Sequence, residues 1–191
     1  KWRGVISITD ARPSDACVVA NAHALARYAA LCQEGGLVPI VEPEVLMDGS
    51  HTIDRCDAVT RQVLTAVFEH LSGQGVRLEA MLLKPNMVVA GQNCPTQAGV
   101  TEVARRTVAC LKAVVPGAVP GIVFLSGGQS DEDATAHLDA MNRLDEERPW
   151  ALSFSYGRAL QAAALKAWGG ETSAVPAGQK AFLHRAQLNG A

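Results

Sequence analysis

Lys84 is the residue of this sequence best placed to do chemistry, because it directly follows the apolar stretch Met81–Leu83. A lysine with apolar strand neighbours either pairs with a carboxylate or gives up its proton. An unprotonated lysine amine attacks carbonyl carbons and forms a Schiff base. The alternative is an ordinary lysine at a strand end, whose ammonium group reaches solvent.

Two glutamates on the preceding apolar segment favour the chemical interpretation. Glu42 and Glu44 flank Pro43, so in extended backbone their side chains face the same side. Two close carboxylates hold their protons unequally, so one can act as an acid or base while the other stays ionised beside Lys84. Two solvated loop glutamates are the alternative, and this short motif is a weak signal on its own.

Two glycine-containing turns further along the chain could bind an anion. Ser126-Gly127-Gly128 precedes a helix start at Ser130, and Gly157-Arg158 opens the next helix. Backbone N–H groups in such turns, together with a helix N-terminus and a guanidinium group, attract phosphate. Each turn alone could be a plain tight turn, but the two occur on consecutive loops.

The remaining composition argues against several classes of site. With 17 Lys and Arg against 19 Asp and Glu, the net charge is −2, so nothing points to nucleic acid or to a membrane surface. No histidine ends a predicted strand, so no metal is expected, and without a dinucleotide fingerprint or a Walker loop no organic cofactor is expected either. The five cysteines form no C-x-x-C pair, and we expect a reducing cytoplasm.

Five repeats of apolar strand, polar loop and amphipathic helix must position these residues. The predicted strands are Trp2–Ile8, Leu37–Val41, Leu78–Leu83, Gly121–Leu125 and Ala151–Phe154. The predicted helices run from about 13 to 35, 53 to 73, 101 to 115, 130 to 144, 157 to 168 and 177 to 187. The polar residues then lie at the C-terminal ends of parallel strands, on the face where barrel enzymes have their active sites.

Two architectures fit this α/β pattern: a doubly wound open sheet and a (β/α)₈ barrel. Five strands cannot close a barrel, so the pattern alone favours the open sheet, whereas the site residues favour the barrel. The chain of 191 residues is expected to form a single domain. Because it begins at Lys1 directly before an apolar strand, we expect it to be a fragment.

Four long motifs in this order resemble class I fructose-1,6-bisphosphate aldolase. They are Gly36–Glu44 (GLVPIVEPE), Leu82–Val88 (LLKPNMV), Val123–Ser130 (VFLSGGQS) and Pro149–Leu160 (PWALSFSYGRAL), with support from Lys1–Arg3 and Ala164–Gly170. The resemblance implies a partial (β/α)₈ TIM barrel of about five of the eight β-α units, strands four to eight, over residues 1–191. Its open edges would be the first and last strands.

The resemblance also implies roles for the site residues. Lys84 matches the Schiff-base lysine, Glu42 the general acid/base, and Glu44 the carboxylate beside it. Lys1 matches a lysine that polarises the substrate, and Arg3 a nearby basic residue. The residues that match the C1-phosphate site and its neighbour are Ser126, Gly127, Ser155, Gly157 and Arg158.

The function implied is cleavage of fructose 1,6-bisphosphate, a sugar phosphate, into dihydroxyacetone phosphate and glyceraldehyde 3-phosphate, in a cytoplasmic homotetramer. Two alternatives stay open. One is another Schiff-base sugar-phosphate aldolase. The other is a non-catalytic aldolase remnant that acts as a binding module. This second alternative stays open because these 191 residues have no counterpart of the family's first three strands, an active-site Asp, a second Lys and the tyrosine-ended tail.

Overall fold

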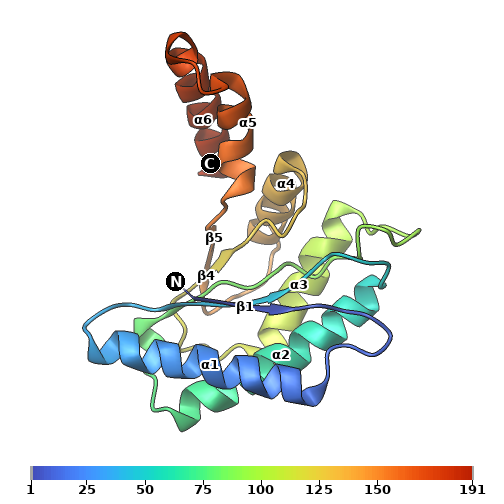
Figure 1. The fold of residues 1–191 in the computed structure, drawn as a ribbon. Helices are drawn as coiled ribbons and strands as arrows, with labels where there is room; N and C mark the ends of the chain where they lie inside the picture. Colours follow the sequence, from blue (N-terminus) through green and yellow to red (C-terminus); the bar gives the residue numbers. More distant parts are fainter. Residues whose placement is uncertain (1, 191) are drawn as a thin grey trace.

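The computed structural model describes residues 2–190, in which strands and helices alternate (Figure 1). The strands are β1 (Trp2–Ile6), β2 (Ile40–Val45), β3 (Leu82–Leu83), β4 (Gly121–Phe124) and β5 (Ala151–Phe154). The helices are α1 (Asp15–Glu34), α2 (Ile53–Gly73), α3 (Val100–Val114), α4 (Asp131–Asn142), α5 (Arg158–Trp168) and α6 (Val175–Asn189). Two short 3₁₀ turns, Leu78–Ala80 and Thr172–Ala174, complete the elements described.

The five strands form one parallel sheet in the order β1-β2-β3-β4-β5. A doubly wound sheet would reverse its strand order at a switch point, and this sheet does not. Within residues 2–190 the sheet is open, with β1 and β5 at its edges. The predicted α/β fold of five β-α units with two open edges is therefore confirmed.

Strand β2 extends further than the sequence indicates. The predicted strand ended at Val41, but β2 runs from Ile40 to Val45 and pairs with β1 along its length, with Arg3 opposite Glu42 and Val5 opposite Glu44. The two glutamates therefore lie within the strand and not in a loop after it. Apolar periodicity missed this extension because the two glutamates interrupt the apolar run, and their carboxylates instead pair with Lys84 and Arg3.

Strand β3 is shorter than predicted, because Leu78–Ala80 forms a 3₁₀ turn and only Leu82 and Leu83 are strand. Gln33, near the end of α1, accounts for the turn. Its amide donates to the carbonyl groups of Arg77 and Ala80 (2.8 and 3.2 Å) and accepts from the Arg77 N–H (2.9 Å). A tertiary contact thus overrides the apolar pattern.

Side-chain caps fix the starts of three helices. Ser14, Thr52 and Ser130 each accept a hydrogen bond from the backbone N–H three residues later, at 3.0–3.2 Å. Such caps satisfy backbone donors that a helix leaves unpaired at its first turn. The last helix, α6, is slightly longer at both ends than the predicted range.

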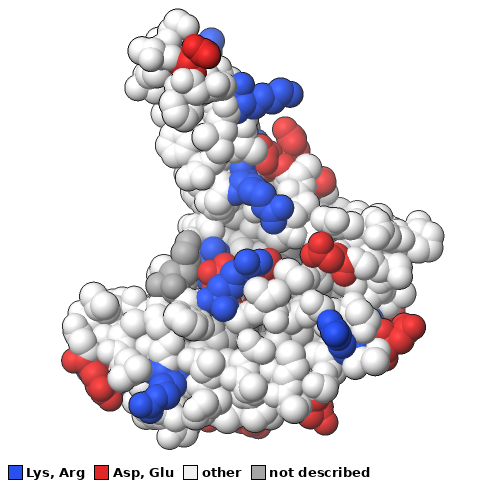
Figure 2. All heavy atoms as spheres, viewed as in Figure 1, with Lys and Arg blue, Asp and Glu red and all other residues white. Residues whose placement is uncertain are grey.

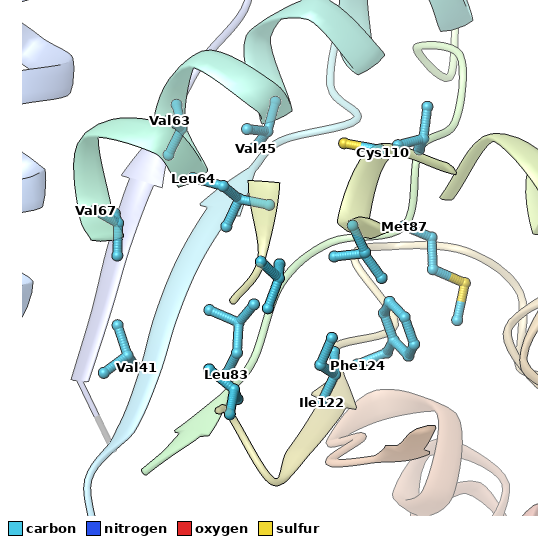
Figure 3. Packing of buried hydrophobic residues seen from close by; sticks show 14 of the residues in the cluster. Val41, Val45, Val63, Leu64, Val67, Leu83, Met87, Cys110, Ile122 and Phe124 are labelled. Carbon is cyan, nitrogen blue, oxygen red and sulfur yellow. The ribbon is translucent and has the colours of Figure 1, made fainter. Parts of the chain in front are cut away.

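The buried core lies between the sheet and the helices that cover it (Figure 3). The three neighbouring strands β2, β3 and β4 contribute the fully buried residues Val41, Leu83, Ile122 and Phe124, and Leu64 of α2 packs among them. Each such side chain contributes about 1.5–3 kcal/mol through its burial. This core fixes the strands, and so the polar residues at their ends.

Figure 1 shows α1 and α2 side by side under the strands, and α5 and α6 as a projecting hairpin at the opposite end. The hairpin carries exposed apolar side chains, among them Leu165, Trp168 and Phe182. No helix in residues 2–190 combines the length and apolar character needed to cross a membrane.

Candidate active site

The predicted site residues within the described chain line one cavity of about 420 Å³ at the C-terminal ends of the strands. Leu125 is the additional lining residue, and Lys1 lies outside the described residues. Figure 2 shows acidic and basic side chains meeting in the hollow at the centre of one face. The predicted residues in the cavity are Arg3, Glu42, Glu44, Lys84, Ser126, Gly127, Ser155, Gly157 and Arg158.

Lys84 is aimed into this cavity by the end of β3. Its backbone N–H donates to the Val41 carbonyl at 2.7 Å, which continues the ladder between β2 and β3. Its Nζ lies 2.9 Å from Glu42 Oε1, and both side chains are only 7% exposed. A buried ion pair of this kind keeps the amine and a proton-accepting carboxylate in contact and shields both from water.

Glu44 has a different partner. Its buried carboxylate forms an ion pair and hydrogen bond with Arg3 Nε, on the neighbouring strand β1. The hydrogen bond to Glu44 raises the pKa of Arg3 above its ordinary value, so Arg3 stays charged. Because Glu44 is paired with Arg3, Glu42 is the carboxylate in contact with Lys84.

At the end of β4, Ser126 is buried and the two glycines after it adopt left-handed backbone conformations, with φ of 61° at Gly127 and 91° at Gly128. Residues other than glycine are strained in that conformation. The turn is closed by Gln129, whose backbone N–H and side-chain amide both donate to the Ser126 carbonyl (3.0 and 2.9 Å). The predicted small glycine turn thus has a defined shape.

At the end of β5, Gly157 is the N-cap of α5 and no side-chain hydrogen bond caps this helix in the part of the chain described. Its first N–H groups, together with the exposed Arg158, are therefore open to an anion at the cavity wall. Tyr156, just before Gly157, donates from its hydroxyl to the Ala134 carbonyl at 2.8 Å and so ties this loop to α4.

Sequence reasoning missed two buried residues behind the site. Asn86 was part of a motif but had no role; it is 5% exposed and bonds to three different residues. His137 had no role assigned to it; it is buried in α4, with Nδ1 2.6 Å from Gln129 Oε1, and burial lowers its pKa. A polar residue right after a buried strand is the only signal that pointed to Asn86.

The described residues offer no place for a metal ion, because they contain no cluster of three or more His, Cys, Asp or Glu side chains suited to one. The five cysteines are unpaired thiols. The cavity brings the amine of Lys84 beside the carboxylate of Glu42, and its lining also includes the glycine turns and the exposed Arg158.

Comparison with known proteins gives a consistent match over the chain. The family model described as fructose-bisphosphate aldolase class-I matches residues 1–191. The chain is 56% identical over 190 residues to the non-muscle fructose-bisphosphate aldolase of Lethenteron camtschaticum, covering 100% of this chain and 52% of that protein. It is 53% identical over 189 residues to the cytosolic aldolase 4 of Arabidopsis thaliana, covering 99% and 48%.

A solved structure agrees with these matches. The fructose-bisphosphate aldolase of Plasmodium falciparum, solved with TRAP and a small-molecule inhibitor, superposes with a TM-score of 0.95 at 49% identity. The superposition covers 98% of this chain and 55% of that one. The open five-stranded sheet thus matches part of an aldolase fold, and the chain spans about half the length of the curated relatives it matches.

Proposed function

The chain belongs to the class I fructose-bisphosphate aldolase family, and from that membership we propose that the full-length gene product containing it cleaves fructose 1,6-bisphosphate through a Schiff base on Lys84. The observation that carries the proposal is the buried contact of 2.9 Å between Lys84 Nζ and Glu42 Oε1, in a cavity whose other wall presents Ser126, Gly157 and Arg158.

The first step is imine formation. Glu42 takes a proton from Lys84, and the free amine attacks the C2 carbonyl of the open-chain sugar. One proton moves from the new ammonium nitrogen to the oxygen, and Glu42 returns the proton that it took, so the oxygen leaves as water and the nitrogen is left as an iminium. Because Glu42 lies against Lys84 and is shielded from solvent, it can act as base and then acid without moving far.

The iminium carbon is then an electron sink. When the C4 hydroxyl loses its proton to a carboxylate, the C3–C4 bond breaks, its electron pair forms an enamine, and glyceraldehyde 3-phosphate leaves. Protonation of the enamine at C3 and hydrolysis of the imine release dihydroxyacetone phosphate and restore Lys84. No electrons are exchanged with an external group, so the step needs no redox cofactor.

The opposite wall binds the C1 phosphate in this proposal. Gly127 and Gly157 supply backbone N–H groups, and Arg158 supplies a charged donor. Ser126 and Ser155 add hydroxyl donors. Arg3, which lies on β1 and is paired with Glu44, acts on the substrate in this proposal, and Lys1 polarises it as the family resemblance implies.

The same proposal includes a cytoplasmic homotetramer, as the family resemblance implies, which light scattering of the full-length gene product tests. The catalytic proposal is tested by borohydride reduction in the presence of dihydroxyacetone phosphate, followed by peptide mass mapping. A stable adduct on Lys84 is expected. An adduct on Lys166, or activity that a metal chelator abolishes and borohydride does not, would refute the assignment.

A further inference from the structure

Asn86 uses both ends of its side-chain amide in the buried region behind the cavity. Its Oδ1 accepts from the Val45 N–H at 3.0 Å, and its Nδ2 donates to Thr60 Oγ1 at 3.1 Å and to the Met87 carbonyl at 3.0 Å. The Cys56 sulfur lies further away, at 4.0 Å from Nδ2. Because an asparagine amide has two N–H donors, both are used here.

The hydrogen bond from the Val45 N–H to Asn86 Oδ1 takes the place of a backbone hydrogen bond that β3 does not supply to β2. Alternate residues of a strand direct their backbone groups to opposite neighbours; Leu46 donates to Ile6 on the β1 side, and Val41 accepts from Lys84 on the β3 side. Pro43, the next residue facing β3, has no N–H to donate. In the described structure, backbone hydrogen bonding between β2 and the β3 segment ends with the bond from the Lys84 N–H to the Val41 carbonyl.

On the β3 side, Asn86 therefore holds the stretch of β2 that lies beyond this backbone pairing, whereas β1 pairs with the same stretch on its other side. That stretch contains Glu42 and Glu44, and its last residue, Val45, is bonded to the Asn86 side chain. On the other side, Thr60 of α2 is 2% exposed and holds the Asn86 amide in place. The side chain thus joins β2, the loop that begins with Lys84, and α2.

We propose that Asn86 is a positioning residue, which fixes the glutamate-bearing end of β2 against Lys84 and so maintains the Glu42–Lys84 contact. This inference rests on the proposed Schiff-base function and assigns a new residue to it. Asparagine suits the position because aspartate cannot donate, leucine cannot bond at all, and glutamine is one methylene longer.

The size of the expected effect follows from geometry. A misplacement of reacting groups by 1 Å costs about 10²-fold in rate. Asn86→Ala in the full-length gene product should therefore lower kcat for fructose 1,6-bisphosphate cleavage by about 10²-fold, and slow borohydride trapping of dihydroxyacetone phosphate on Lys84 in parallel. KM should barely change, because the phosphate-binding wall is not touched.

Two further variants make the test specific. Thr60→Val removes one acceptor of the Asn86 amide and should give a smaller fall in kcat, which Thr60→Ser should restore. Asn93→Ala is the matched control, since Asn93 is an exposed residue of the following loop. If Asn86→Ala does not fold, the pair Thr60→Val and Thr60→Ser decides the question.

The outcomes separate this inference from the function it rests on. If the unaltered protein gives no adduct on Lys84, the proposed function is wrong and the inference falls with it. If the unaltered protein is trapped at Lys84, but Asn86→Ala and Thr60→Val only lower the melting temperature and leave kcat and the trapping rate unchanged, Asn86 is merely structural and the inference alone is overturned.

Discussion

At the β2–β3 end of the cavity the polar groups are buried side chains, whereas at the β4–β5 end they are largely backbone groups and an exposed arginine. Lys84 and Glu42 are each 7% exposed and contact one another, while Gly157 and Arg158 are exposed. The first end shields an amine and its proton partner from water. The second end keeps donors open to a charged group that arrives from solvent.

This difference between buried side chains and exposed backbone groups indicates where function depends on the identity of a side chain. At the β2–β3 end each carboxylate has its own cation, so one substitution leaves a buried charge without a partner. At the β4–β5 end the proposed phosphate site uses several backbone N–H groups, so a single side-chain substitution removes only part of the phosphate binding. The two ends should therefore respond to mutation in different ways.

The largest effect is expected for Lys84→Met. Cleavage by the full-length gene product should fall by several orders of magnitude, because no neighbouring group can form the imine. Stability should also fall, by about 3–5 kcal/mol, because Glu42 loses its partner. Steady-state kinetics and urea unfolding measure the two effects.

A double variant separates these losses. Lys84→Met with Glu42→Gln should recover much of the stability and none of the cleavage. Lys166→Met, at an exposed lysine of α5, is the matched control and should change neither. Cleavage that survives in Lys84→Met would refute the distinction between the two ends.

Glu42→Gln alone should lower kcat by about 10²- to 10⁴-fold, the range for loss of a general acid/base. Glutamine keeps a hydrogen-bonding group near Lys84 but cannot exchange the proton. Because the phosphate wall is untouched, KM should change little. A rise in KM at constant kcat would show that Glu42 serves only in binding.

Arg158→Ala should act mainly on KM. A charge-assisted hydrogen bond is worth about 1.5–3 kcal/mol, and the exposure of Arg158 places the expected effect at the lower end, roughly tenfold in KM. Stability should not change measurably, in contrast to Lys84→Met. A fall in kcat equal to that of Glu42→Gln would remove the contrast between the two ends.

The smallest effect concerns His137, behind the β4–β5 end. Burial lowers its pKa, while nearby Asp133 opposes that shift. The unfolded chain therefore takes up the proton first, and stability is lost as the pH falls below about 6.5. In His137→Gln the loss of stability between about pH 7.5 and about pH 5.5 should be smaller, as urea unfolding measures. An unchanged pH dependence would show that His137 contributes nothing to it.

The sequence by itself determined the parallel α/β pattern, the helix start at Ser130 and most of the residues that meet in the cavity. Long apolar strands and amphipathic helices are local patterns, and the C-terminal ends of parallel strands lie at one edge of a sheet whatever the details of packing. Lys84 and the two glycine turns could be selected because each directly follows such a strand.

Only the tertiary structure decided which glutamate contacts Lys84, where β2 and β3 end, and what Asn86 does. Glu42 and Glu44 are equivalent in the sequence pattern, and pairing of Glu44 with Arg3 of β1 distinguishes them. The extent of β2 depends on β1, and the turn before β3 depends on Gln33 of α1. These outcomes depend on contacts between residues 26 or more positions apart, which no local pattern encodes.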